Sequence, residues 1–110
     1  MSKRLPEITH LQFLVLEALA ERETSGRALR AMLATYGITN SAPAFYQMMS
    51  RLEEAGLADG WYDQRVVDGQ HIKERCYRLA KAGKRTLADT RSFYLDRLTA
   101  AKVVKKPSHA

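Results

Sequence analysis

The chain has 110 residues, of which 45% are hydrophobic and 27% charged, and this composition suits one soluble domain with a small core. Its formal net charge of +6 comes entirely from residues 61–110, because residues 1–60 hold six Lys or Arg against seven Asp or Glu. A basic half favours a polyanionic partner, although simple solubility explains the same charge. No apolar run approaches the ~20 residues of a membrane-spanning helix, so we expect no membrane partner.

Several kinds of site are excluded by residue type and spacing. The single Cys76 excludes an internal disulfide and a cysteine-based zinc site, and the three histidines lie too far apart to share a metal. The N-terminal residues lack the apolar core of a signal peptide, so we expect a cytoplasmic protein. We find no nucleophile–base pair and no glycine-rich phosphate loop, and therefore expect no enzyme, metal or cofactor.

The first predicted helix begins after Thr9 and runs to about Arg22. Thr9 and Gln12 form a T-x-x-Q capping box at its start. The helix is apolar on nearly all sides, and a domain of this size rarely covers one helix completely. We therefore expect a homodimer, with three residues of this helix at its interface: Phe13, Leu16 and Ala20.

The second predicted helix spans Ser25 to about Tyr36 and ends at Gly37. We expect Arg27 and Arg30 to face outward, where they suit phosphate contacts, and the apolar residues to face inward: Ala28, Leu29, Met32, Leu33 and Tyr36. The short link to the next helix predicts a helix-turn-helix unit. A helix pair with no nucleic-acid role has the same pattern.

The third predicted helix begins at Ser41, which suits both an N-cap and a phosphate contact, and ends before Gly56. One face is apolar and would anchor the helix: Phe45, Met48, Met49 and Leu52. The other face carries hydrogen-bonding side chains of a length that suits the DNA major groove: Tyr46, Gln47, Ser50 and Arg51. An ordinary solvated surface helix fits the same pattern, and Arg51 has the alternative of pairing with Glu53 or Glu54.

From Trp61 the sequence predicts two strands, WYDQRVV and HIKERCYRL, joined across Asp68-Gly69-Gln70 as a β-hairpin. Lys73 and Arg75 share a face with Tyr77 and Leu79, and would extend toward the DNA backbone or minor groove. Cys76 falls on the opposite face, as a small strand hydrophobe or a redox sensor. Three helices followed by a hairpin predict a mainly α (α+β) winged helix-turn-helix with a two-stranded wing.

The last predicted helix, about Lys81 to Val103, is longer than the domain needs, so its far half would leave the core. We expect it to dimerise through one apolar stripe, with Phe93 and Leu95 beside it: Leu87, Tyr94, Leu98 and Ala101. The chain is then a single domain, 1–110. It divides into a winged-helix core at 7–80, a dimerisation helix at 81–103 and a tail at 104–110.

Two segments, FYQMMSRLEEAGLADGW and ERCYRLAKAGKRTL, resemble the two signature blocks of the PadR-like winged-helix transcriptional regulators. The first block is matched by Tyr46, Arg51, Leu52, Glu53, Gly56 and Leu57. The second block is matched by Tyr77, Arg78, Leu79, Ala82 and Gly83. The resemblance covers roughly residues 7–100, and the two blocks at this separation are fairly specific.

The chain also departs from the family pattern. The family's Gly-Thr-Leu-Tyr-Pro appears here as residues 43–47, PAFYQ, so Ala44 replaces the Thr that faces DNA. Ala80 replaces the Thr that caps the last helix, and no Gly-Arg-Pro-type basic wing tip is present. The change at residue 44 bears on the operator preference that the family resemblance implies, and the change at residue 80 removes about 1 kcal/mol of helix stability.

The resemblance implies a homodimeric repressor on a pseudo-palindromic double-stranded DNA operator. The predicted DNA-binding residues are Arg27, Arg30, Ser41, Ala44, Tyr46, Gln47, Ser50, Arg51, Lys73 and Arg75. The resemblance also implies release by a small hydrophobic or aromatic effector, for which Phe13, Leu16, Phe93 and Tyr94 are candidate pocket residues; plain interface core is the alternative for them. A winged-helix module that binds protein instead of DNA is the competing hypothesis, and the acidic Glu53, Glu54 and Asp59 favour it.

Overall fold

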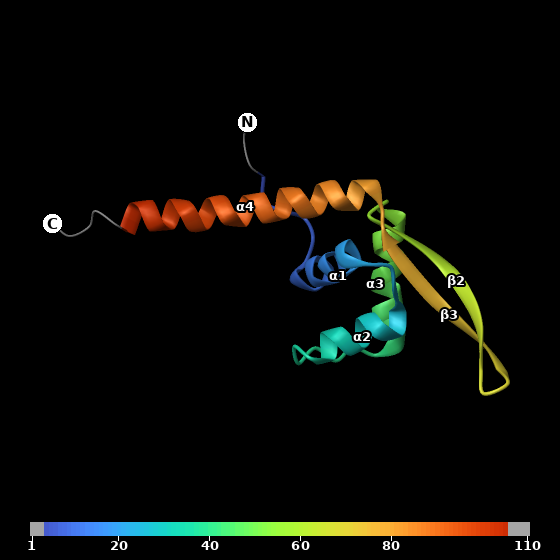
Figure 1. The fold of residues 1–110 in the computed structure, drawn as a ribbon. Coiled ribbons are helices and arrows are strands. Elements are labelled where there is room, and N and C mark those ends of the chain that lie inside the picture. Colours follow the sequence, from blue (N-terminus) through green and yellow to red (C-terminus); the bar gives the residue numbers. More distant parts are fainter. Residues whose placement is uncertain (1–3, 106–110) are drawn as a thin grey trace.

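The computed structural model describes residues 4–105, with side chains described up to residue 100. Along the chain, these residues form α1 (His10–Glu21), β1 (Thr24–Ser25), α2 (Gly26–Ala34), α3 (Ala42–Glu54), β2 (Ala58–Val67), β3 (Gln70–Leu79) and α4 (Lys81–Lys105) (Figure 1). The predicted fold class, a winged helix-turn-helix of mainly α (α+β) character, is confirmed. The hairpin points away from the helices, and α4 crosses over α1 and continues beyond it (Figure 1).

The helix starts follow from local side-chain hydrogen bonds. At α1, the Gln12 N–H donates to the Thr9 hydroxyl at 3.0 Å and the Thr9 N–H donates to the Gln12 side chain at 2.9 Å, which is the predicted capping box. The Ser41 hydroxyl caps α3 by accepting from the Ala44 N–H at 3.2 Å. Gly56, with φ +77°, ends α3 in the left-handed conformation that favours glycine.

The sheet has the order β1-β3-β2, and all its pairs are antiparallel. Asp68 (φ 53°) and Gly69 (φ 77°) form a two-residue turn, since Val67 pairs with Gln70. Positive φ at both turn residues is what a tight hairpin with the native twist requires. The predicted hairpin is therefore confirmed, whereas the two-residue strand β1, beside the base of β3, was not predicted.

The core lies where α1, α2 and α3 meet β3 and the start of α4; its fully buried side chains are Val15, Leu16, Leu29, Leu33, Phe45, Met49, Leu52 and Tyr77. Two predicted interface residues belong to this core, since Leu16 is 0% and Leu87 2% exposed. Their assignment to the dimer interface is wrong, because each is covered by its own chain. The predicted inward positions of Ala28 and Tyr36 are also wrong, because both are exposed.

The far half of α4 carries apolar side chains that no part of the described chain covers. Tyr94 is 47%, Leu95 62% and Leu98 64% exposed, although Glu17 and Arg91 pair across α1 and α4 at 2.5 Å one turn earlier. α4 ends at Lys105, two residues beyond the predicted end. The side chain of Ala101 and the predicted tail residues 106–110 lie outside the described part of the chain. No helix of the described residues is long and apolar enough to cross a membrane.

Candidate nucleic-acid interface

The outer face of α3 divides into two stripes. Tyr46, Ser50 and Glu53, spaced by four and three residues, turn toward the hairpin and line a hollow between α3 and the wing. Ala44, Gln47 and Arg51 form the neighbouring stripe, and all three side chains are exposed. The sequence places Tyr46, Gln47, Ser50 and Arg51 on one outer face. In the structure, Tyr46 and Ser50 line the hollow beside the hairpin, whereas Gln47 and Arg51 lie outside it.

The hollow between α3 and the wing has a volume of about 470 Å³. It brings together four predicted DNA-binding residues: Tyr46, Ser50, Lys73 and Arg75. The lining is completed by three residues that were not predicted for this site, Glu53, Tyr62 and Tyr77. The place of Tyr62 at this site could have been predicted from the sequence, because the two-residue turn at Asp68-Gly69 sets the register that pairs Tyr62 with Arg75.

Arg75 is occupied within the protein. Its guanidinium lies 2.6 Å from Glu53 Oε1, and it stacks over the rings of Tyr62 at 4.8 Å and Tyr77 at 5.7 Å. Burial alone lowers the pKa of the Arg75 guanidinium, but Glu53 and Tyr77 raise that pKa by more, so it stays charged. The predicted extension of Arg75 toward DNA is therefore not what the structure shows.

Tyr46 is half-buried and supports the junction between α2 and α3. Its ring meets Phe45 edge-on, with ring centroids 5.0 Å apart. A Cβ atom at Gly26 would lie 2.7 Å from the Tyr46 ring and hydroxyl, so only glycine permits this close approach at the start of α2. Part of Tyr46 is thus structural, and the rest faces the hollow.

The side chains of Arg27, Arg30 and Arg51, which were also predicted to bind DNA, differ in their exposure and in their contacts within the protein. Arg27 is exposed, whereas Arg30 is half-buried and donates from Nη2 to the Asn40 carbonyl at 3.1 Å, which ties α2 to the loop before α3. Arg51 makes no ion pair within residues 4–105, so its predicted alternative of pairing with Glu53 or Glu54 is not seen. Glu53 pairs with Arg75 instead.

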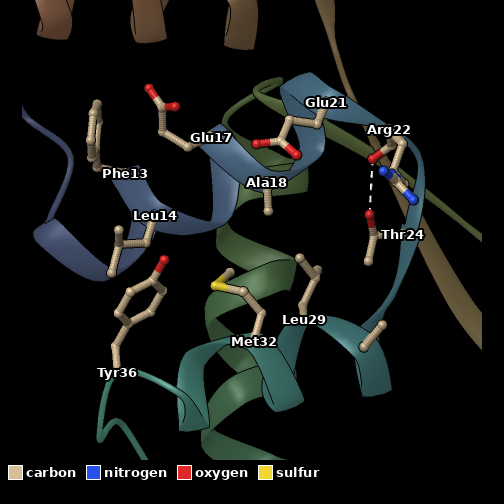
Figure 2. Close-up of a pocket in the computed structure, with 11 residues that line it drawn as sticks. Phe13, Leu14, Glu17, Ala18, Glu21, Arg22, Thr24, Leu29, Met32 and Tyr36 are labelled. Atoms are coloured by element: carbon tan, nitrogen blue, oxygen red, sulfur yellow. Dashed lines mark hydrogen bonds between the residues drawn. The ribbon is translucent and has the colours of Figure 1, made fainter.

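The four candidate effector residues are not assembled into one cavity by a single chain. Phe13 lines a groove of about 650 Å³ between α1 and α2, where Leu14 and Ala18 face Met32 and Leu29 (Figure 2). Phe93 lines a different hollow, between residues 4–8 and α4, and Leu16 is fully buried. Phe93 and Tyr94 touch edge-on at 5.2 Å. The four residues therefore do not line one cavity within a single chain, and their prediction as a cavity near the dimer interface stays a prediction.

Of the two interpretations of Cys76, a small strand hydrophobe and a redox sensor, the environment of the thiol favours the first. Burial raises the pKa of the Cys76 thiol, and the charges of Asp63 and Glu74 raise it further. Because the thiolate is the reactive form, this environment disfavours redox chemistry. Within the described residues, no cluster of three or more His, Cys, Asp or Glu is placed to hold a metal ion.

The buried Tyr77 makes the stability of the domain depend on alkaline pH. Burial raises the pKa of the Tyr77 hydroxyl from 10.0 to about 12. The folded state holds this proton more tightly than the unfolded state does. The stabilisation from the neutral Tyr77 hydroxyl should therefore be complete below pH ~10, and the free energy of unfolding should fall by up to about 2.7 kcal/mol as the pH rises toward 12. Urea unfolding at pH 9 and 11 measures this fall. The free energy of unfolding of Tyr77→Phe should fall less between pH 9 and 11. An equal fall would show that Tyr77 is not the cause of the pH dependence.

No protein-family sequence model and no curated protein sequence matches the chain. Solved structures do match it. A PadR-family transcriptional regulator from Eggerthella lenta is 26% identical and has a TM-score of 0.60, over 86% of this chain and 84% of that one. A PadR-family transcription regulator from Clostridium difficile is 14% identical and has a TM-score of 0.68, over 86% of this chain and 99% of that one.

Bacillus subtilis PadR, solved in complex with operator DNA, has a TM-score of 0.59 to this chain at 19% identity. The match covers 74% of this chain and 46% of PadR. The resemblance to PadR-like winged-helix regulators is thereby confirmed. These neighbours are transcriptional regulators rather than enzymes, which agrees with the expectation for this chain.

Proposed function

We propose that this chain, which has the winged-helix fold of the PadR-family transcriptional regulators, is a cytoplasmic, dimeric repressor that binds double-stranded DNA sequence-specifically. The observation that carries the proposal is the open stripe of α3, where Gln47 and Arg51 are exposed beside the hairpin. Gln pairs with adenine and Arg with guanine through two hydrogen bonds each in the major groove. The B. subtilis neighbour, solved with operator DNA, supports the same partner.

Each predicted DNA-binding residue has a role in this proposal. Gln47 and Arg51 read bases, with Ala44 close to the base edges. Arg27 and Lys73 contact phosphates from the two sides of α3. Ser41, Arg30, Tyr46 and Arg75 support the positions of α2, α3 and the wing through the hydrogen bonds, packing and ion pair described above, and Ser50 lines the hollow beside them.

The dimer is proposed from α4. Tyr94 and Leu98, with Leu95 beside them, form an exposed group of large apolar side chains on α4, and a second copy would cover it. Ala20, which is exposed on α1, and the half-buried Phe13 lie on the helix that α4 crosses. A two-fold dimer binds two half-sites about one helical turn apart, which makes the proposed operator pseudo-palindromic.

We place the small hydrophobic or aromatic effector of the proposal in the groove of Figure 2. Its wall is mostly apolar, with Phe13 and Leu14 at one end, and Glu17, Glu21 and Arg22 on its rim. We propose that a ligand there changes how α1 packs against α2 and so moves the arginines of α2. A panel of small aromatic molecules, titrated into the protein–DNA complex, tests this part, and Phe13→Ala should abolish any release.

The deciding experiment is selection from a random duplex pool with the full chain, followed by sequencing, at two salt concentrations. We expect an enriched motif with two related half-sites about one turn apart, and binding that weakens steeply with salt. Salt-sensitive binding without a motif would replace the proposal by a non-specific role. No binding at low salt would overturn it in favour of the protein-binding module.

Arg51→Gln and Gln47→Ala should each weaken binding to the selected motif by about 1–3 kcal/mol and relax the preference at one base per half-site. Arg85→Gln is the matched control for Arg51, because it removes one exposed positive charge from α4. Competition binding against single-base variants of the motif gives both readouts. Equal weakening by Arg51→Gln and Arg85→Gln, with the motif unchanged, would show that Arg51 reads no base.

A further inference from the structure

We propose that the Glu53–Arg75 ion pair is a clamp that sets the angle between the wing and α3, so that both reach one DNA site together. Glu53 and Arg75 are then positioning residues for DNA binding and make no DNA contact themselves. This inference rests on the proposed function and adds a device to it. It replaces the predicted DNA contact of Arg75 by a positioning role. It also gives a role to Glu53, whose negative charge is repelled by the phosphates of DNA.

The clamp is a direct side-chain link between α3 and the wing. Glu53 lies on the last turn of α3 and Arg75 in the middle of β3, 22 residues later, and the pair measures 2.6 Å. The two side chains are 24% and 25% exposed, so water screens them less than the Asp59–Arg78 pair, whose side chains are 53% and 59% exposed. The rings of Tyr62 and Tyr77 hold the guanidinium from β2 and β3.

Gly60 makes room for this arrangement. It lies on β2 opposite Tyr77, and a Cβ atom there would approach Glu53 Oε1 to 2.7 Å and Arg75 Nη2 to 2.8 Å. A side chain at residue 60 would therefore displace the ends of the Glu53 and Arg75 side chains. Three elements, α3, β2 and β3, thus place one guanidinium and one carboxylate at a single point.

Because the clamp lies far from the tip of the wing, a small change of angle at the clamp moves the tip by a large distance. Beyond Arg75, β3 extends five residues to Gln70, or about 17 Å at 3.3–3.4 Å per residue, and no helix covers this outer part (Figure 1). A change of about 10° at Arg75 would therefore move the tip by about 3 Å, more than a hydrogen bond tolerates. Lys73, two residues along the same face, moves with it.

The two roles of Arg75 predict opposite effects of a neutral residue at position 53. If Arg75 binds a phosphate, Glu53→Gln frees its guanidinium and tightens DNA binding. If the pair is a clamp, the same change loosens the wing and weakens binding. Asp59→Asn is the matched control, because it removes one negative charge and breaks an exposed pair, Asp59–Arg78, that stays within the hairpin.

The test measures affinity for the duplex selected above. We expect Glu53→Gln to bind at least fivefold more weakly than Asp59→Asn, with the salt dependence of the wild type. Arg75→Gln should do the same, and the double variant should lose no more than the weaker-binding single variant. Binding by Glu53→Gln that equals or exceeds Asp59→Asn overturns the clamp, as does a salt slope for Arg75→Gln reduced by about one.

A distance measurement separates the clamp from the proposed function. Spin labels at Val66→Cys on the wing and Ala31→Cys on α2, both exposed positions, are placed in a Cys76→Ser background. We expect a narrow distance distribution for wild type and Asp59→Asn, and a broadened one for Glu53→Gln, with circular dichroism confirming the fold. An unchanged distribution overturns the clamp. If the wild type selects no motif, the proposed function is overturned. The distance distributions then still show whether the Glu53–Arg75 pair restrains the wing.

Discussion

Gly83→Ala is expected to lower the free energy of unfolding by about 3 kcal/mol or more, although alanine at an ordinary helical site stabilises by about 1 kcal/mol relative to glycine. Gly83 lies in the first turn of α4 and is buried. A Cβ atom there would lie 2.0 Å from the Leu57 carbonyl oxygen and 2.8 Å from Leu79 Cδ1. A backbone atom cannot rotate away as a side chain does, so either α4 or the segment after α3 must move.

The movement has a second cost. The same Leu57 carbonyl accepts a hydrogen bond from the Ala80 N–H at 3.0 Å, which joins the start of α4 to the end of α3. A shift that relieves the clash stretches this bond, and no side chain caps α4 at Ala80 to replace it.

Urea unfolding followed by circular dichroism measures the effect, with Ala88→Gly as the control. Ala88 is exposed on the same helix, so its replacement should cost only about 1 kcal/mol through helix propensity. If Gly83→Ala unfolds at the same or a higher urea concentration than the wild type, the close contact between α4 and Leu57 is not as described.

Leu98→Asp is expected to convert the proposed dimer to a monomer and to weaken binding to the selected operator at least a hundredfold. Leu98 is 64% exposed in one chain, on the same stripe as Tyr94. In a dimer that covers this stripe, the aspartate would bury an unpaired charge, which costs several kcal/mol. A hundredfold rise in the dissociation constant corresponds to only about 2.7 kcal/mol.

Sedimentation equilibrium gives the oligomeric state, and Ala100→Asp is the control. Residue 100 is exposed and lies about two hundred degrees around the helix from Leu98, so the same charge is added to the opposite face. Leu98→Asp should be monomeric and Ala100→Asp dimeric, with both melting near the wild-type temperature once dissociation is allowed for. A dimeric Leu98→Asp would show that this stripe is not the interface.

The features that the sequence determined by itself are local. The Thr9–Gln12 capping box and the Ser41 cap involve groups three residues apart, so their hydrogen bonds form as soon as the helix turn forms. The Asp68-Gly69 turn is equally local, yet it sets the register of the whole hairpin. The order of elements, and with it the winged-helix fold, follows from such signals.

Only the tertiary structure decided which apolar and charged side chains meet. Leu16 and Leu98 look alike as apolar helix residues, but within the described part of the chain Leu16 is fully covered and Leu98 stays 64% exposed. Helical spacing places Arg51 beside acidic residues, whereas the hairpin brings Arg75 to Glu53 from 22 residues away. Periodicity gives the direction of a side chain on its own element, and the partner depends on how elements pack. For that reason the frame of the candidate site was predictable, and the division of its residues into exposed and clamped ones was not.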